Sequence, residues 1–83
     1  MTLDDAIAEI KALIMVASPA AAVQVVRISD EEARVSVDAP AAEIGAIQDA
    51  VRDRTIQLMV SEGLDVQVFV YDKDAPKGVV AEG

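Results

Sequence analysis

The chain of 83 residues has no cysteine, histidine or tryptophan, and only one phenylalanine and one tyrosine. Without thiol or imidazole groups it cannot build a Ser-His or Cys-His nucleophile, an ordinary zinc site, haem or iron–sulfur ligation by those residues, or a disulfide framework. Many enzyme and metalloprotein classes are therefore excluded, and we expect neither a metal nor a cofactor.

Basic residues are also scarce, because seven Lys and Arg side chains face fifteen Asp and Glu side chains and give a net charge of −8. A nucleic-acid reader needs a basic stripe that displaces counterions from phosphates. The sequence argues against a nucleic-acid partner and instead predicts surface ion pairs, such as Asp49 with Arg52 three residues later. The four arginines are spread along the chain, at Arg27, Arg34, Arg52 and Arg54.

Long apolar runs are missing as well. Ala12–Ala17 is among the longest, and a membrane span needs about 18 residues. Asp4 and Asp5 stand where a secretory signal carries positive charge, so we expect a cytoplasmic protein. With 53% apolar residues, the chain has the length and composition of one folded domain.

Two amphipathic segments predict helices over residues 3–17 and 41–62. Thr2 can cap the first helix, and Gly63 can close the second in a left-handed conformation. Near the end of each helix the apolar side chains spread around the axis, which indicates a second neighbour there. The expected buried stripes are Leu3, Ile7, Ile10 and Ile14 in the first helix and Ile44, Ile47, Val51, Thr55 and Leu58 in the second.

Three segments rich in β-branched residues predict strands over residues 23–28, 33–38 and 64–71. The short polar link between the first two favours an antiparallel hairpin, but no Asn-Gly or Asp-Gly pair sets its turn, so its register stays open by one residue. From residue 73 to 83 the periodicity ends. We therefore predict a single domain over residues 1–72 and a flexible C-terminal tail over 73–83.

The element order α-β-β-α-β predicts a two-layer α+β fold in which a three-stranded mixed sheet carries both helices on one face, since a right-handed crossover packs the second helix on the side of the first. The other face of the sheet is left uncovered, and the strand order stays open. We expect this uncovered face to carry Arg34, Ser36, Gln67, Phe69 and Tyr71, together with Val23 and Val25 of the first strand.

Phe69 and Tyr71 are the whole aromatic content, and both fall on the uncovered face. Exposed aromatics often anchor a partner, which makes this face a candidate contact surface; alternatively, the tail or the end of the first helix folds over it. A domain this small gains buried area by pairing with a copy of itself, so we predict a homodimer. A second candidate surface lies at the apolar helix ends, around Val16, Ile56 and Val60.

The carboxylates offer little chemistry. The segments Asp30–Glu32 and Asp72–Asp74 lack the glycine, the further oxygen ligands and the terminal Glu of a calcium loop, and they indicate a solvated turn and tail. Acid–base catalysis would need a carboxyl group in a dry cleft, and a two-layer fold suggests none. We do not expect an enzyme.

From Ala33 to Asp72 the chain resembles the C-terminal half of the alkaline shock protein family. The resemblance is carried by the strand 33–37, the Ile47-Gln48-Asp49-Ala50-Val51 run, and Gly63-Leu64 followed by an alternating valine strand. It implies a small, non-catalytic protein that associates with itself or with cell-envelope partners. The chain departs from the family in a longer second helix and in the missing strand before the first helix.

Two other families share the element order. Type II KH domains bind RNA through a Gly-x-x-Gly loop with basic flanks, but here Gly45 stands without a second glycine or a lysine nearby. The dimerisation domain of cation-diffusion transporters pairs through its sheet and usually carries metal-binding histidines, which this chain lacks. Similarity of fold alone does not transfer function.

These observations give three hypotheses. The first is a structural or interaction module that self-associates, with a further protein partner possible. The second is a module that binds a small apolar ligand or an extended peptide beside Phe69 and Tyr71. The third is a degenerate KH-like domain with weak or no RNA binding.

Overall fold

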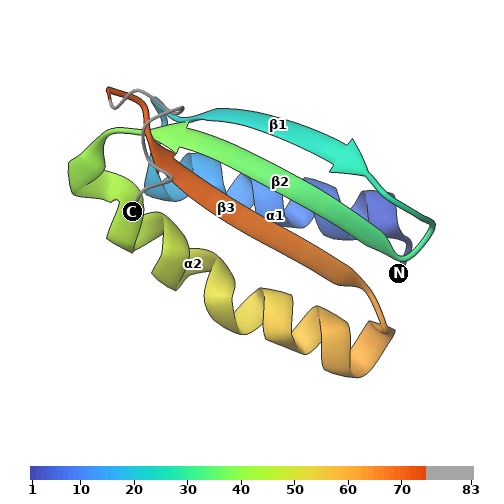
Figure 1. The fold of residues 1–83 in the computed structure, drawn as a ribbon. Coiled ribbons are helices and arrows are strands. Elements are labelled where there is room, and N and C mark those ends of the chain that lie inside the picture. Colours follow the sequence, from blue (N-terminus) through green and yellow to red (C-terminus); the bar gives the residue numbers. More distant parts are fainter. Residues whose placement is uncertain (75–83) are drawn as a thin grey trace, which may run out of the picture.

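The computed structural model describes residues 1–74 and confirms the predicted α+β fold, with two helices on one face of a three-stranded mixed sheet (Figure 1). The main helices run antiparallel to each other, α1 behind β1 and β2 and α2 along β3. In chain order the elements are α1 (Leu3–Ala17), β1 (Ala22–Arg27), β2 (Glu32–Ala39), η1 (Ala41–Glu43), α2 (Ile44–Gln57), η2 (Leu58–Glu62) and β3 (Asp65–Asp72).

Helix α1 begins at the predicted cap. The backbone N–H of Asp5 donates to the Thr2 hydroxyl at 3.2 Å, and the Thr2 N–H donates to the Asp5 carboxylate at 3.3 Å. These reciprocal bonds satisfy amides that the first helical turn leaves free, while Asp4 and Asp5 favour the positive end of the helix dipole. Pro19 follows the C-cap, Ser18, whose buried hydroxyl donates to the Glu43 carboxylate at the start of the second helical region.

The sheet has the order β1-β2-β3, with β1 antiparallel and β3 parallel to β2. The central strand contributes alternate residues to the core, where Val35 and Val37 are fully buried beneath the helices. This alternation buries one face of a sheet and leaves the other to solvent. The core consists of Leu3, Ala6, Ile7, Ile10, Ile14, Ala33, Val35, Val37, Ala39, Ile47, Val51, Leu58, Leu64 and Val66.

The predicted helix over residues 41–62 divides into three parts. A 3-10 turn follows Pro40, where the Glu43 N–H donates to the Pro40 carbonyl at 2.8 Å, and α2 then gives way to the wider π turn η2. Gly63 closes the segment with φ +67°, as the sequence predicted. The Leu64 N–H then donates to the Leu58 carbonyl at 3.2 Å, and both leucine side chains enter the core.

The predicted position of Val25 on the uncovered face is wrong, and so is that of Val23. Val25 pairs with Val35 and Val23 with Val37, and both lie partly buried against the core. Strand β1 is apolar at odd and even positions alike, so its own pattern could not choose the face. The hairpin register decides it, and it sends Val26 to the uncovered face instead.

The prediction of a flexible tail over residues 73–83 stays a prediction, and residues 75–83 lie outside the described part of the chain. At its start, the Lys73 N–H donates to the Ala39 carbonyl at 3.0 Å and continues the pairing of β3 with β2. No helix within residues 1–74 is both long enough and apolar enough to cross a bilayer.

Candidate interaction surface on the open sheet face

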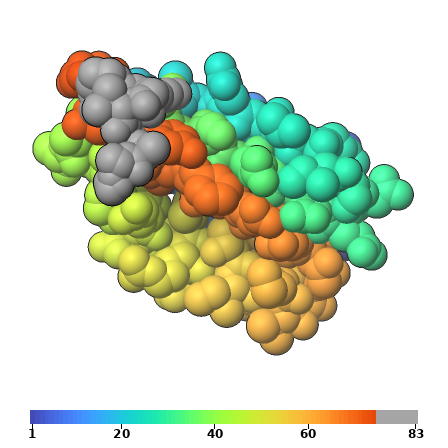
Figure 2. Space-filling view, viewed as in Figure 1, coloured from blue at the N-terminus to red at the C-terminus, as the bar shows by residue number. Residues whose placement is uncertain are grey.

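The uncovered side of the sheet, called here the open face, collects alternate residues of all three strands (Figure 2). In this view β1, β2 and β3 run across the front of the molecule in cyan, green and orange. The register gives its members as Ala22, Gln24, Val26, Glu32, Arg34, Ser36, Asp38, Asp65, Gln67, Phe69 and Tyr71.

The aromatic pair lies on the open face, as predicted, and is half covered. Phe69 retains 40% and Tyr71 38% of its accessible surface. Phe69 pairs with Ser36, so its cross-strand neighbour on β2 is a small residue. The Arg34 guanidinium carbon lies 5.6 Å from the centre of the Phe69 ring, a cation–π distance that holds the one cation of this face beside its largest apolar group.

One end of the open face is polar and internally bonded. The Gln67 side-chain amide donates to the Glu32 carboxylate at 2.8 Å and to the Asp65 carboxylate at 3.1 Å. This arrangement fixes Gln67 and leaves two carboxylates at the rim. The predicted members Arg34, Ser36, Gln67, Phe69 and Tyr71 are therefore brought together on one surface.

The second predicted surface does not form a single patch. Val16 is 83% exposed at the C-terminal end of α1, whereas Val60 is 80% exposed at the far end of the other helix, where Ile56 is also exposed. Because the two helices run antiparallel, these ends lie at opposite ends of the molecule (Figure 1).

Sequence reasoning did not single out two exposed apolar residues beside the hairpin turn. Val26 (58% exposed) lies near the end of β1, and Ile28 directly follows the strand. Val26 belongs to the open face, and no signal in the sequence distinguished it from Val25 before the register was known.

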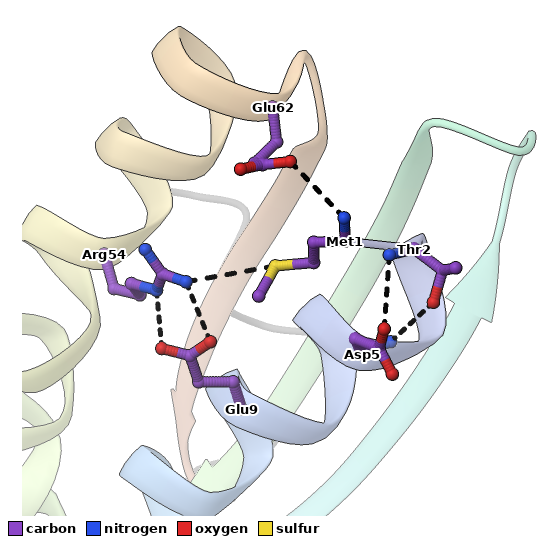
Figure 3. A network of polar contacts seen from close by, with 6 residues as sticks. All are labelled: Met1, Thr2, Asp5, Glu9, Arg54 and Glu62. Carbon is purple, nitrogen blue, oxygen red and sulfur yellow. Dashed lines mark hydrogen bonds and ion pairs between the residues drawn. The ribbon is translucent and has the colours of Figure 1, made fainter.

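A polar cluster joins the two helices at the start of α1 (Figure 3). The Arg54 guanidinium donates to both oxygens of Glu9, at 2.5 and 2.9 Å, and to Gln57 at 2.8 Å. The Met1 amine lies 3.6 Å from the Glu62 carboxylate. The hydrogen bond from Arg54 holds the pKa of Glu9 below its ordinary value, and Glu9 in turn raises the pKa of Arg54.

Arg27, Arg52 and Arg54 each form an ion pair within the chain. Arg52 pairs with Asp49 at 3.1 Å, as predicted, and Arg27 pairs with Asp4 of α1. The long-range pairs Arg27–Asp4 and Arg54–Glu9 were not predicted, because their members lie far apart in the sequence.

Within residues 1–74 there is no pocket and no group of three or more carboxylates placed to hold a metal ion. No family model, curated protein or solved structure matches the chain. The resemblance to the alkaline shock protein family therefore stays a prediction.

Proposed function

We propose that this protein is a non-catalytic interaction module that associates with a second copy of itself through the open face. The observation that carries the proposal is the position of Phe69 and Tyr71: the only two aromatic side chains lie half exposed on the open face rather than in the core. Tyr and Phe supply large, rigid contact area and are enriched in the cores of interfaces.

Two charged residues of the open face, Arg34 and Asp38, can complement each other across a two-fold axis. On β2, Arg34 and Asp38 lie two residues on either side of Ser36. Two open faces can stack about a two-fold axis that lies between the sheets, perpendicular to the strands and at the level of Ser36. This axis reverses the strand direction, so that Arg34 lies over the partner's Asp38 and Phe69 over the partner's Phe69. This arrangement is isologous, which is the usual symmetry of a homodimer.

The size of the face predicts weak association. Three strands about 4.8 Å apart, with up to eight residues each rising about 3.3 Å, give a face of ~370 Å² per copy. Two copies then bury ~740 Å², below the ~1,000 Å² expected of a stable interface. Covering the exposed 40% of a ring of ~200 Å² contributes ~2 kcal/mol, so each Phe69 carries a large share of the association energy.

Sedimentation equilibrium over a concentration series tests the proposal. We expect reversible self-association that Phe69→Ala with Tyr71→Ala weakens strongly. A matched control is Ile56→Ala with Val60→Ala at the far helix end, which should leave association unchanged. If the control abolishes association and the aromatic variant does not, the helix end is the interface and the open face is not.

A charge exchange avoids the loss of ring packing. Arg34→Asp and Asp38→Arg should each weaken self-association, because each places like charges opposite one another across the axis. An equimolar mixture of the two variants restores opposite charges at both positions and should recover association. Association that is unchanged in the single variants, or a mixture that fails to recover, would count against this packing.

The same variants separate the other hypotheses. If the Phe69→Ala variant still forms the oligomer but no longer binds an extended peptide, the result supports the peptide-binding hypothesis. If the protein binds mixed RNA measurably at physiological salt, the result supports a KH-like role. A cytoplasmic location belongs to the proposal and is tested by cell fractionation.

A further inference from the structure

Strand β1 is an edge strand without the usual protection. Among residues 1–74, no strand pairs with its outer edge. Its sequence, Ala-Val-Gln-Val-Val-Arg, contains no proline, glycine or lysine, and its one charge, Arg27, pairs with Asp4. Natural edge strands are generally guarded by such residues, because an unpaired row of N–H and C=O groups recruits another strand. The opposite edge strand, β3, carries an aspartate at each end.

The hairpin shows which backbone groups of β1 point outward. The Ile28 N–H donates to the Glu32 carbonyl at 2.9 Å, and this pair continues the register in which Val26 faces Arg34 and Gln24 faces Ser36. Hydrogen-bonded pairs alternate along an antiparallel ladder. The N–H and C=O groups of the intervening residues therefore point away from β2, and these residues are Val23, Val25 and Arg27.

A second copy of β1 fits this edge in phase. Residues opposite each other in an antiparallel pair share a face, so the pairing must bring odd-numbered residues opposite odd-numbered ones. An axis at Val25 satisfies this rule and overlaps residues 23–27, five of the six residues of β1. It places Val23 opposite the partner's Arg27 and Gln24 opposite the partner's Val26, and the outward backbone groups of each strand meet those of the other.

Helix α1 presents exposed surface on the same side of the molecule. The Arg27–Asp4 pair turns the Asp4 flank of α1 toward β1, and helical spacing continues this flank through Ala8, Lys11 and Met15. All three are exposed. The axis that pairs the strands also brings α1 beside its symmetry mate, so the pairing covers helix surface as well as the strand edge.

We infer that β1 pairs antiparallel with β1 of a second copy about a two-fold axis at Val25, which creates a continuous six-stranded sheet. The pairing of the strands is argued only from the unprotected edge of β1, whereas its role in assembly rests on the proposed function. Edge pairing buries backbone and helix surface in addition to the ~370 Å² that one open face offers to a partner.

Val25→Pro is the direct test. Its ring replaces an N–H that points outward, so the ladder to β2 keeps its bonds while the outer edge loses the donor on the axis. The control Val25→Ala removes side-chain packing and keeps the N–H. We expect the proline variant, folded by circular dichroism, to lose at least tenfold in the association constant at the level of the strand-paired dimer, and the alanine variant to keep it. Equal association of the two folded variants would overturn the inference.

Cysteine cross-linking tests the register even if the proline variant does not fold, since the chain has no cysteine of its own. In the inferred dimer, Gln24 and the partner's Val26 form a non-hydrogen-bonded pair with Cα atoms about 4.5 Å apart, within disulfide range. A mixture of Gln24→Cys and Val26→Cys chains should oxidise mainly to the mixed disulfide. The Gln24→Cys chain alone should cross-link slowly, because its two Cα atoms lie about 7–8 Å apart.

This experiment also separates the inference from the proposed function. Stacking through open faces keeps β1 strands about 10 Å apart, too far for any of these disulfides. A preferred mixed disulfide that persists in the Phe69→Ala, Tyr71→Ala background supports edge pairing even if stacking fails. Association that depends on Phe69 without a preferred mixed disulfide overturns edge pairing and leaves the proposed function standing.

Discussion

The register of β1 predicts that two adjacent valines contribute unequally to stability. Val25 and Val26 have the same side chain and are adjacent in one strand, but Val25 lies against the core and Val26 is 58% exposed on the open face. Replacing each with alanine removes the same two methyl groups and the same β-propensity. Any difference between the variants therefore reports the face on which each side chain lies.

The magnitudes follow from burial. Two fully buried methyl groups contribute ~1.6 kcal/mol at ~0.8 kcal/mol each, and the cavity that remains adds to the loss. For Val37, which is fully buried, we expect Val37→Ala to lower the free energy of unfolding by ~2–3 kcal/mol. Val25→Ala should cost about 1.5 kcal/mol, and Val26→Ala about 0.7 kcal/mol because under half of that side chain is covered.

Urea unfolding at a protein concentration below the onset of self-association measures all three variants. With a slope of about 1 kcal/mol per M urea for a domain of this size, a difference of about 0.7 kcal/mol shifts the urea midpoint by about 0.7 M, so the series is resolvable. The expected order of loss is Val37, Val25, Val26. An equal or larger loss for Val26→Ala than for Val25→Ala would refute the register on which both the open face and the edge pairing depend.

Two further predictions concern local structure. Gly63→Ala should lower the free energy of unfolding by about 1–2 kcal/mol, because a φ of +67° strains any residue with a Cβ. Gly45→Ala inside α2 should raise the free energy of unfolding by up to about 1 kcal/mol, because the added Cβ meets nothing within 4 Å. Urea unfolding measures both variants. The bond from Arg54 lowers the pKa of Glu9, so its stabilisation is present above the ordinary glutamate pKa of about 4.3 and is lost as the pH falls through the lowered value. Glu9→Gln should therefore flatten the acid limb of the stability profile, and an unchanged acid limb would show that the pair contributes nothing to folding.

The elements were predictable because their signals are local. The stripe that includes Ile10 and Ile14, the Thr2–Asp5 cap and the left-handed Gly63 each depend on residues a few positions apart. The open-face positions of Phe69 and Tyr71 followed from the alternation within β3, where Val66, Val68 and Val70 are aliphatic and the aromatics fall between them.

The parts that were missed depend on partners far apart in the chain. Val25 was placed on the wrong face because β1 is apolar at both odd and even positions. Only the pairing of Val25 with Val35 shows which of the two faces is buried. The Arg54–Glu9 pair spans 45 positions and needs the helices to lie side by side. The separation of Val16 from Val60 likewise needs their antiparallel arrangement.

Composition and local periodicity alone determined that this protein is an acidic, two-layer α+β domain with its aromatic side chains outside the core, because the spacing of apolar residues fixes which side of an element seeks burial. Tertiary structure decided which face of β1 packs against the core, which strand has an unprotected outer edge, and which arginine forms the ion pair between the two helices. Those choices belong to strand register and helix packing, where the free energy comes from contacts between segments that no local pattern specifies.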